Sequence, residues 1–365
     1  MKHRLLHPLT SSSLPNLAGL TAEYGCEPQY FPRLLYLGLM ATLRSPLAWF
    51  ESARYENAIR SQSIDPAPVF IVGHWRSGTT YLQNLLSEDP QFGRVTLLQA
   101  AMPRDFLIFP KSLVGRMQRL LPRTRLMDDI KVSAGAPWEE EMALVSSSRL
   151  SFYHVSFFPQ AMKKIFDDAV LLNHGDSELV AQWQEEYFGF LKKVQLTQPG
   201  KRLLLKNPAN TARITLLKQM FPAARFIHIH RNPFEVFAST VHLYMSTQKA
   251  WSLQKMDREM IVNHILDTYP RLMEAYFEQR KTLDSNDLVE IGYDDLVRDP
   301  GTTLRTIYRQ LNINGYDQAV PHLSRYVASQ SGYRRNVLSI PAREEDAIRK
   351  RWQPIFRELG YATGK

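Results

Sequence analysis

The chain has 365 residues, of which 44% are hydrophobic and 22% charged, and this composition excludes disordered and fibrous proteins. Its formal net charge of +9 favours anionic ligands or surfaces, but no dense run of lysines and arginines points to nucleic acid. Cys26 is the single cysteine, which excludes an intramolecular disulfide and a cysteine-held zinc or iron–sulfur site.

The N-terminal region is expected to be helical, as an extension over residues 1–60. Its first residues contain no continuous apolar segment followed by a cleavage site, so we expect no signal peptide and a cytoplasmic protein. The most apolar run, "LLYLGLMATL", lies between Arg33 and Arg44 and is about half as long as a bilayer span. It is either a helix packed on the protein body or a helix on a membrane surface, with peripheral contact through residues 33–44.

Four short apolar runs follow, and each precedes a turn or a helical pattern. They are residues 68–73, 202–206, 225–230 and 288–293. Such alternation predicts an α/β fold in which helices cover both faces of a central, mainly parallel sheet, a three-layer sandwich. Ligands of these sheets bind beyond the carboxyl ends of the strands, so functional residues are expected directly after the four runs.

The chain contains no Gly/Ser-rich linker, and we therefore expect one domain over residues 61–365. Mostly helical patterns separate the first two runs. This helical insertion, at about residues 95–200, is the expected place for a substrate pocket or lid.

The first run leads into the glycine turn "GHWRSGTT", which has the spacing of a phosphate-binding loop. Gly73, Gly78 and Thr80 fit G-x-x-x-x-G-K-[ST], but Thr79 stands where the lysine belongs. Transfer of a γ-phosphoryl group depends on that cationic neutralisation and is therefore disfavoured. What remains is a strand-to-helix turn with backbone donors, hydroxyls and Arg76, which suits a phosphate next to a singly charged group.

A second polar cluster follows the third run, in "RFIHIHRNPFEVFAST". Arg231 comes directly after the strand and Ser239 lies two helical turns later. A guanidinium forks toward phosphate oxygens, and a hydroxyl completes such a site.

Together, "GHWRSGTTYLQNLL" and "HRNPFEVFAST" resemble the sulfotransferase superfamily, in particular a bacterial branch similar to the tyrosylprotein-type enzymes. The segments "LLLKNP", "GYDDLVRDPGTTLRTIY" and "RKRWQPIFRELGY" resemble further parts of that family. The resemblance implies a P-loop-like fold and 3′-phosphoadenosine 5′-phosphosulfate as the sulfuryl donor, without a metal.

The resemblance also implies residue roles. Lys206 would lie near the bridging oxygen or the sulfuryl group, and Arg231 and Ser239 would hold the 3′-phosphate. Tyr333 and Arg335 are candidates for closing over the nucleotide. The residues that would cradle the 5′-phosphosulfate are Arg76, Ser77, Gly78, Thr79 and Thr80.

The general base does not follow from the family patterns, because Asn207 and Pro208 replace the Thr-His that follows the lysine in cytosolic members. The segment "APWEEEMAL" offers carboxylates instead. On a helix, Glu141 would share an apolar stripe with Trp138, and a desolvated carboxylate there would have a raised pKa. Glu139 or Glu141 is therefore the predicted base, with His74 and His154 in reserve.

The predicted function is sulfuryl transfer from this donor to a hydroxyl or amine. The aromatic insertion "SRLSFYHVSFFP" and the apolar N-terminal run favour a hydrophobic, lipid-like acceptor over a polysaccharide. A P-loop kinase-like phosphotransferase and a catalytically inactive nucleotide-binding scaffold are the alternatives. Neither the acceptor's identity nor the oligomeric state follows from the sequence.

Overall fold

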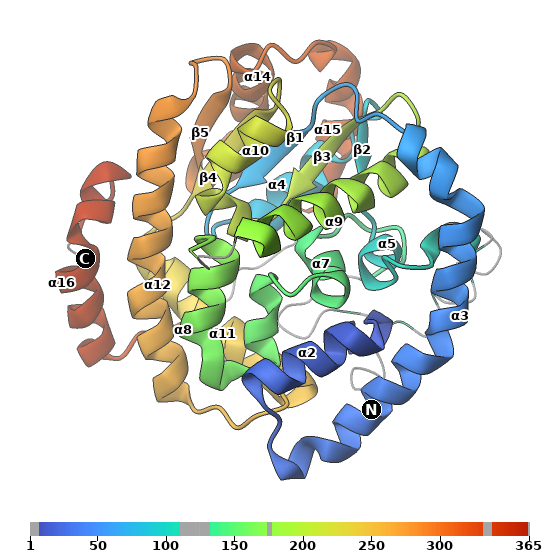
Figure 1. Cartoon of the computed structure of the whole chain (residues 1–365). Coiled ribbons are helices and arrows are strands. Elements are labelled where there is room, and N and C mark those ends of the chain that lie inside the picture. Colours follow the sequence, from blue (N-terminus) through green and yellow to red (C-terminus); the bar gives the residue numbers. More distant parts are fainter. Residues whose placement is uncertain are drawn as a thin grey trace. The chain divides into compact units, whose positions relative to one another are not determined.

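The computed structural model describes residues 7–109, 132–173, 177–330 and 338–363, together with positions 115, 118, 121 and 124. The described chain forms two compact units. The sheet unit comprises residues 66–93, 202–242 and 259–365, and the helical unit comprises residues 1–65, 94–201 and 243–258. The ribbon of both is drawn in Figure 1.

A five-stranded sheet with the order β2-β3-β1-β4-β5 organises the sheet unit. β1 pairs in parallel with β3 and β4, and β4 pairs in parallel with β5. The strands are β1 (Val69–Val72), β2 (Phe92–Arg94), β3 (Arg202–Lys206), β4 (Arg225–His230) and β5 (Leu288–Gly292). The predicted α/β class and mainly parallel sheet are thus confirmed. The three-residue β2 was not predicted.

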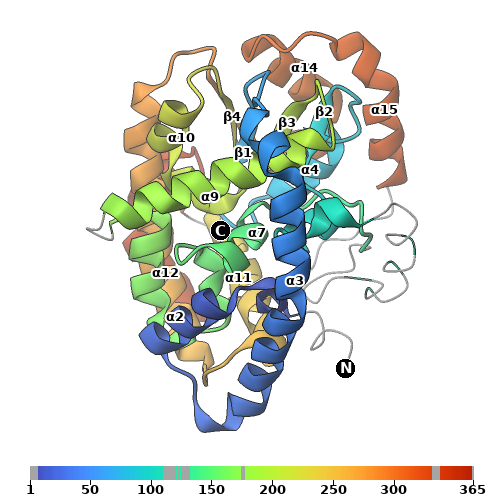
Figure 2. The same cartoon turned by 45° about the vertical axis from the view of Figure 1, so that its right-hand side comes forward.

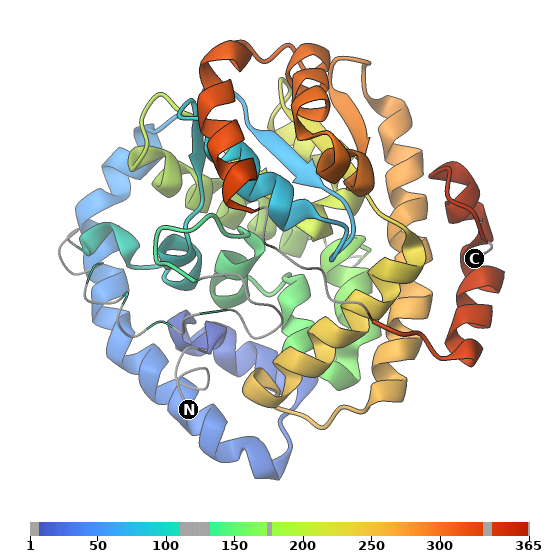
Figure 3. The ribbon, with the colours of Figure 1, turned by 180° about the vertical axis from the view of Figure 1, so that it is seen from behind.

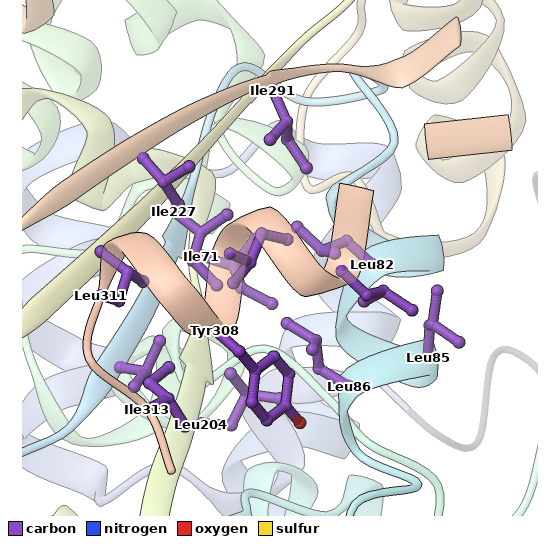
Figure 4. Close-up of a cluster of buried hydrophobic side chains, with 14 of the residues drawn as sticks. Ile71, Leu82, Leu85, Leu86, Leu204, Ile227, Ile291, Tyr308, Leu311 and Ile313 are labelled. Atoms are coloured by element: carbon purple, nitrogen blue, oxygen red, sulfur yellow. The ribbon is translucent and has the colours of Figure 1, made fainter. Parts of the chain in front are cut away.

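Helices cover both faces of this sheet. Behind it lie α4 (Thr79–Leu86), α14 (Pro300–Gln310) and α15 (Tyr316–Ser329), as Figure 3 shows. Ile71, Ile227 and Ile291 of the strands meet Leu82 and Tyr308 of these helices in a buried apolar cluster (Figure 4). Because side chains alternate along a strand, this burial accounts for every second residue of the central strands.

The opposite face of the sheet packs on α10 (Ile214–Met220) and α12 (Arg258–Gln279). Phe70 stacks on Phe226 with ring centroids 5.5 Å apart and meets Phe221 at 5.9 Å. His228 stacks on Tyr276 of α12 at 3.9 Å. The remaining helices of four or more residues that start in this unit are α11 (Pro233–Trp251), α13 (Tyr293–Arg298) and α16 (Ala342–Glu358), with a 3-10 turn at Pro208–Ala212.

The helical unit contains the N-terminal helices and the predicted insertion in one compact body. Buried ion pairs join its segments: Arg44 pairs with Asp105, and Lys193 pairs with Glu51. Figure 2 shows α3 and α9, two of the helices that these pairs connect. Its α-helices are α2 (Leu14–Tyr24), α3 (Phe31–Ser61), α5 (Leu97–Ala101), α7 (Glu141–Ser147), α8 (Met162–Ile165) and α9 (Ser177–Leu196). Across the described ranges, every helix is too short or too polar to cross a bilayer.

Candidate functional site

The carboxyl ends of four strands meet at one edge of the sheet. Ile71 of β1 is in register with Lys206 of β3, and His230 of β4 is in register with Gly292 of β5. The segments that follow these strands therefore begin side by side. In sheets of this kind, ligands bind at this edge, so the site predicted there stays a prediction that the strand register permits.

Sterics determine the shape of the glycine loop between β1 and α4. Gly73 has φ 138°, and a Cβ there would lie 2.3 Å from the carbonyl oxygen of Ile229. Gly78 has φ 104°, and its Cβ would lie 2.3 Å from Cδ2 of Tyr293. Arg76 has φ 71°, a left-handed conformation that non-glycine residues rarely adopt. The chain thus uses a strained, glycine-dependent backbone where α4 begins.

Hydrogen bonds connect the loop to α11 and the start of α4 to the end of β3. Arg76 donates from Nε to Oγ of Ser239 at 2.9 Å, which brings the two sequence motifs into direct contact. Lys206 is 2% exposed, and its Nζ donates to Oγ1 of Thr80 at 3.4 Å. The hydroxyl of Ser77 is buried and has no hydrogen-bond partner among the described residues. A buried hydroxyl without a partner, in a loop that also carries Arg76, is an arrangement that an anionic ligand would complete.

Arg231 lies at the same edge, directly after β4. Its Nη2 pairs with Glu235, and the guanidinium carbon lies 4.7 Å from the ring centroid of Tyr293. Its Nε is buried and lacks a partner within the described chain. One donor of this arginine is therefore still available to a ligand.

Tyr293 contacts both parts of the site, because its ring lies against Gly78 and beneath Arg231. The prediction assigned it no role, although it stands in the quoted segment "GYDDLV" and is the last residue of the fourth predicted run, 288–293. In the structure it directly follows β5.

Removing the Tyr293 ring should leave the Arg231 guanidinium less firmly positioned. We expect Tyr293→Ala to weaken binding of adenosine 3′,5′-bisphosphate by about threefold to thirtyfold, since a cation–π contact contributes about 0.5 to 2 kcal/mol. Tyr293→Phe keeps the ring and serves as the control. Calorimetric titration checks both variants, and equal losses in the two would contradict a role for the ring face.

The predicted bases belong to the helical unit. α7 begins at Glu141, so Trp138 and Glu139 precede the helix, and the expectation that Trp138 and Glu141 share a helical stripe is wrong. The carboxylate of Glu141 is buried and accepts the Phe152 N–H at 2.7 Å and the Ser151 hydroxyl at 3.0 Å. Glu139 is half-buried and accepts the Tyr153 hydroxyl.

The two reserve histidines are buried. Nδ1 of His74 lies 2.7 Å from the Trp75 carbonyl, and Nε2 of His154 lies 3.1 Å from the Val145 carbonyl. Burial lowers the pKa of each to about 4. Both make the contacts of structural core histidines. Tyr333 and Arg335, the candidates for closing over the nucleotide, lie outside the described residues.

Two solved structures share this fold. The chain superposes on sulfotransferase STF9 from Mycobacterium avium with a TM-score of 0.69 at 18% identity, covering 96% of each chain. On sulfotransferase STF1 from Mycobacterium tuberculosis H37Rv the TM-score is 0.63 at 21% identity, covering 86% of this chain and 85% of that one. The likeness defines the P-loop-like α/β fold predicted from the sequence.

Residues 68–318, more than half of the chain, match the model of the Sulfotransferase family. The chain belongs to this family. Omega-hydroxy-beta-dihydromenaquinone-9 sulfotransferase Stf3 of Mycobacterium tuberculosis is 28% identical over 322 residues, covering 88% of this chain and 82% of that protein, and Stf3 of Mycobacterium bovis gives the same values. The predicted enzyme class, a sulfotransferase rather than a kinase, is confirmed.

Proposed function

We propose that the enzyme transfers a sulfuryl group from 3′-phosphoadenosine 5′-phosphosulfate to a hydroxyl or amine of a hydrophobic, lipid-like acceptor. The observation that carries the donor assignment is the pair of buried polar atoms without partners, Oγ of Ser77 and Nε of Arg231, at one edge of the sheet. Buried donors of this kind are costly unless a ligand satisfies them. Two separate atoms fit a donor with two separate anionic groups.

In this proposal the loop residues 76–80 cradle the 5′-phosphosulfate, and Arg231 with Ser239 holds the 3′-phosphate. Lys206, hydrogen-bonded to Thr80, supplies the cation that stabilises charge on the bridging oxygen as its bond to sulfur breaks. The Arg76–Ser239 hydrogen bond joins the two halves. The proposed transfer uses no metal, because Lys206 and the arginines supply the positive charge.

We propose Glu139 as the base that takes the acceptor's proton while the new oxygen–sulfur bond forms. Glu139 is half-buried, whereas Glu141 is buried and accepts hydrogen bonds from Ser151 and Phe152, and Glu140 is fully buried and accepts the Tyr187 hydroxyl. The O–H donated by Tyr153 orients Glu139. The role of Glu141 is then to position the segment that carries Glu139.

The acceptor class is supported by Stf3, whose name states a menaquinone derivative as its substrate. The aromatic insertion at 148–159, which suggested such an acceptor, adds no further support, because Phe152, Phe157 and Phe158 are buried in the helical unit. We further propose a cytoplasmic enzyme that contacts a membrane peripherally through residues 33–44. The division into an extension at 1–60, a domain at 61–365 and an insertion at about 95–200 stays a prediction.

The test is an acceptor screen with sulfur-labelled donor, comparing long-chain alcohols, hydroxylated quinones, amines and polysaccharides. Label should move to the hydrophobic alcohols, and transfer should continue in excess chelator. Preferential labelling of polysaccharide would overturn the acceptor class. Tight binding of adenosine 3′,5′-bisphosphate without transfer to any acceptor would favour an inactive scaffold, and chelator-sensitive phosphate transfer from ATP would favour a kinase.

A further inference from the structure

Helix α3 has two faces of opposite character. Its contacts with the rest of the helical unit involve mainly small or paired residues: Leu37, Ala41, Ala48 and Glu51 are buried, and Glu51 pairs with Lys193 of α9. At about 100° per residue, these four positions fall on one side of the helix. The helix therefore packs on its unit through a narrow inner face.

The large apolar side chains of α3 lie on the other side. Of the ten large hydrophobic residues that are exposed in the described chain, seven belong to this helix, and Leu35 and Trp49 reach 74% and 72% exposure. We call them the outer face: Phe31, Leu35, Leu39, Leu43, Leu47, Trp49 and Phe50. Five of them recur every four residues, which forms a continuous row along the helix surface. A helix that only covers a protein core would bury this row of large apolar side chains and expose the opposite side.

The charges on α3 favour an anionic partner. The helix carries four arginines and two glutamates. Glu51 is buried and pairs with Lys193, while Arg44 pairs with Asp105 and Arg60 pairs with Glu56. No exposed acidic side chain of α3 therefore lies between Phe31 and Tyr55. Arg54 is exposed at the end of the outer face, with its guanidinium over the Tyr55 ring. The formal net charge of +9 of the whole protein adds to this preference for an anionic surface.

The arrangement of side chains along the outer face matches an interfacial helix. An aromatic residue stands at its start and two aromatics at its end, with leucines between them. A helix that lies in the plane of a bilayer surface buries aromatic and leucine side chains together at the boundary between headgroups and acyl chains. The sequence of α3 is too polar for the helix to cross the bilayer.

We propose that the outer face of α3 docks the enzyme on an anionic lipid bilayer, with the helix lying parallel to the membrane plane. This deepens the proposed function, because it names the surface on which a lipid-like acceptor would be met. The proposed membrane contact thereby extends beyond residues 33–44, from Phe31 to Phe50, and is confined to one side of the helix. The docking itself depends on neither donor nor acceptor.

The test is flotation of the full-length protein with vesicles of equal parts phosphatidylcholine and phosphatidylglycerol. Wild type should float with the vesicles, and Leu39→Ser/Leu43→Ser should lower the partition coefficient by about tenfold or more, since each leucine loses its apolar burial. Val297→Ser removes an exposed apolar residue from the sheet unit and should leave partitioning unchanged. Trp49 should show a blue-shifted emission on vesicles, identified by its loss in Trp49→Phe.

Wild type that stays unbound, or a double variant that floats as wild type does, would overturn the proposal. A wild-type dimer that the double variant converts to monomer, with no vesicle binding by either, would assign the outer face to a second copy instead. Binding of adenosine 3′,5′-bisphosphate is measured in parallel. If that binding is absent while flotation persists, the proposed donor fails and the docking surface stands.

Discussion

Replacing Glu139 by glutamine should lower kcat by about 10² to 10⁴, the usual range for loss of a general base. Glutamine keeps an oxygen that accepts the Tyr153 hydroxyl, so the local structure should persist while the proton acceptor is lost. The affinity for adenosine 3′,5′-bisphosphate should remain within about twofold, because the proposed donor site uses other residues. Steady-state kinetics with a labelled donor and calorimetry on the same samples measure both quantities.

Glu141→Gln is the matched control. In wild type, Oε1 of Glu141 accepts hydrogen bonds from the Ser151 hydroxyl and the Phe152 N–H, and the oxygen of a glutamine can accept the same two bonds. We expect an activity close to wild type from this variant. A fully active Glu139→Gln would contradict the proposed base, and an inactive Glu141→Gln with wild-type folding would transfer the role to Glu141.

Gly73→Ala should have the largest effect on stability. The new Cβ would lie 2.3 Å from the Ile229 carbonyl oxygen of the neighbouring strand, and φ of 138° disfavours any side chain. Since backbone of a central strand cannot move aside cheaply, we expect a loss of about 3 kcal/mol or more in the free energy of unfolding. Thermal and urea unfolding followed by circular dichroism measure the loss.

Gly189→Ala in α9 provides the comparison, because nothing lies within 4 Å of its Cβ position. Alanine exceeds glycine in helix propensity by about 1 kcal/mol, so this variant should be as stable as wild type or slightly more stable. Equal stabilities of the two alanine variants would show that the loop tolerates a side chain at Gly73.

The sheet could be predicted from the sequence because its central strands are continuous apolar runs followed by polar residues. β3 and β4 match the predicted bounds, and the residues after them meet at one edge. β2 was missed because three residues containing a glycine carry too little pattern.

The parts that resisted prediction are those set by contacts between distant residues. The ring of Tyr293 meets Gly78 and Arg231 only in the folded chain. Helix α7 begins three residues later than the Trp138 stripe requires, and the carboxylate of Glu141 is occupied by a segment ten residues further on. The leucines of α3 point outward because the other helices of the unit cover the opposite side of α3. Hydropathy along the sequence does not reveal which side is covered.

The central claim is that Arg231 and Ser239 read a 3′-phosphate. The most direct measurement is calorimetric titration of wild type and Arg231→Ala with adenosine 3′,5′-bisphosphate and adenosine 5′-monophosphate, which differ in that group alone. A charge-assisted hydrogen bond contributes about 1.5 to 3 kcal/mol, so wild type should prefer the bisphosphate by about tenfold to a hundredfold, and Arg231→Ala should lose most of that preference. Equal affinities in wild type, or a preference that survives Arg231→Ala, would contradict the account.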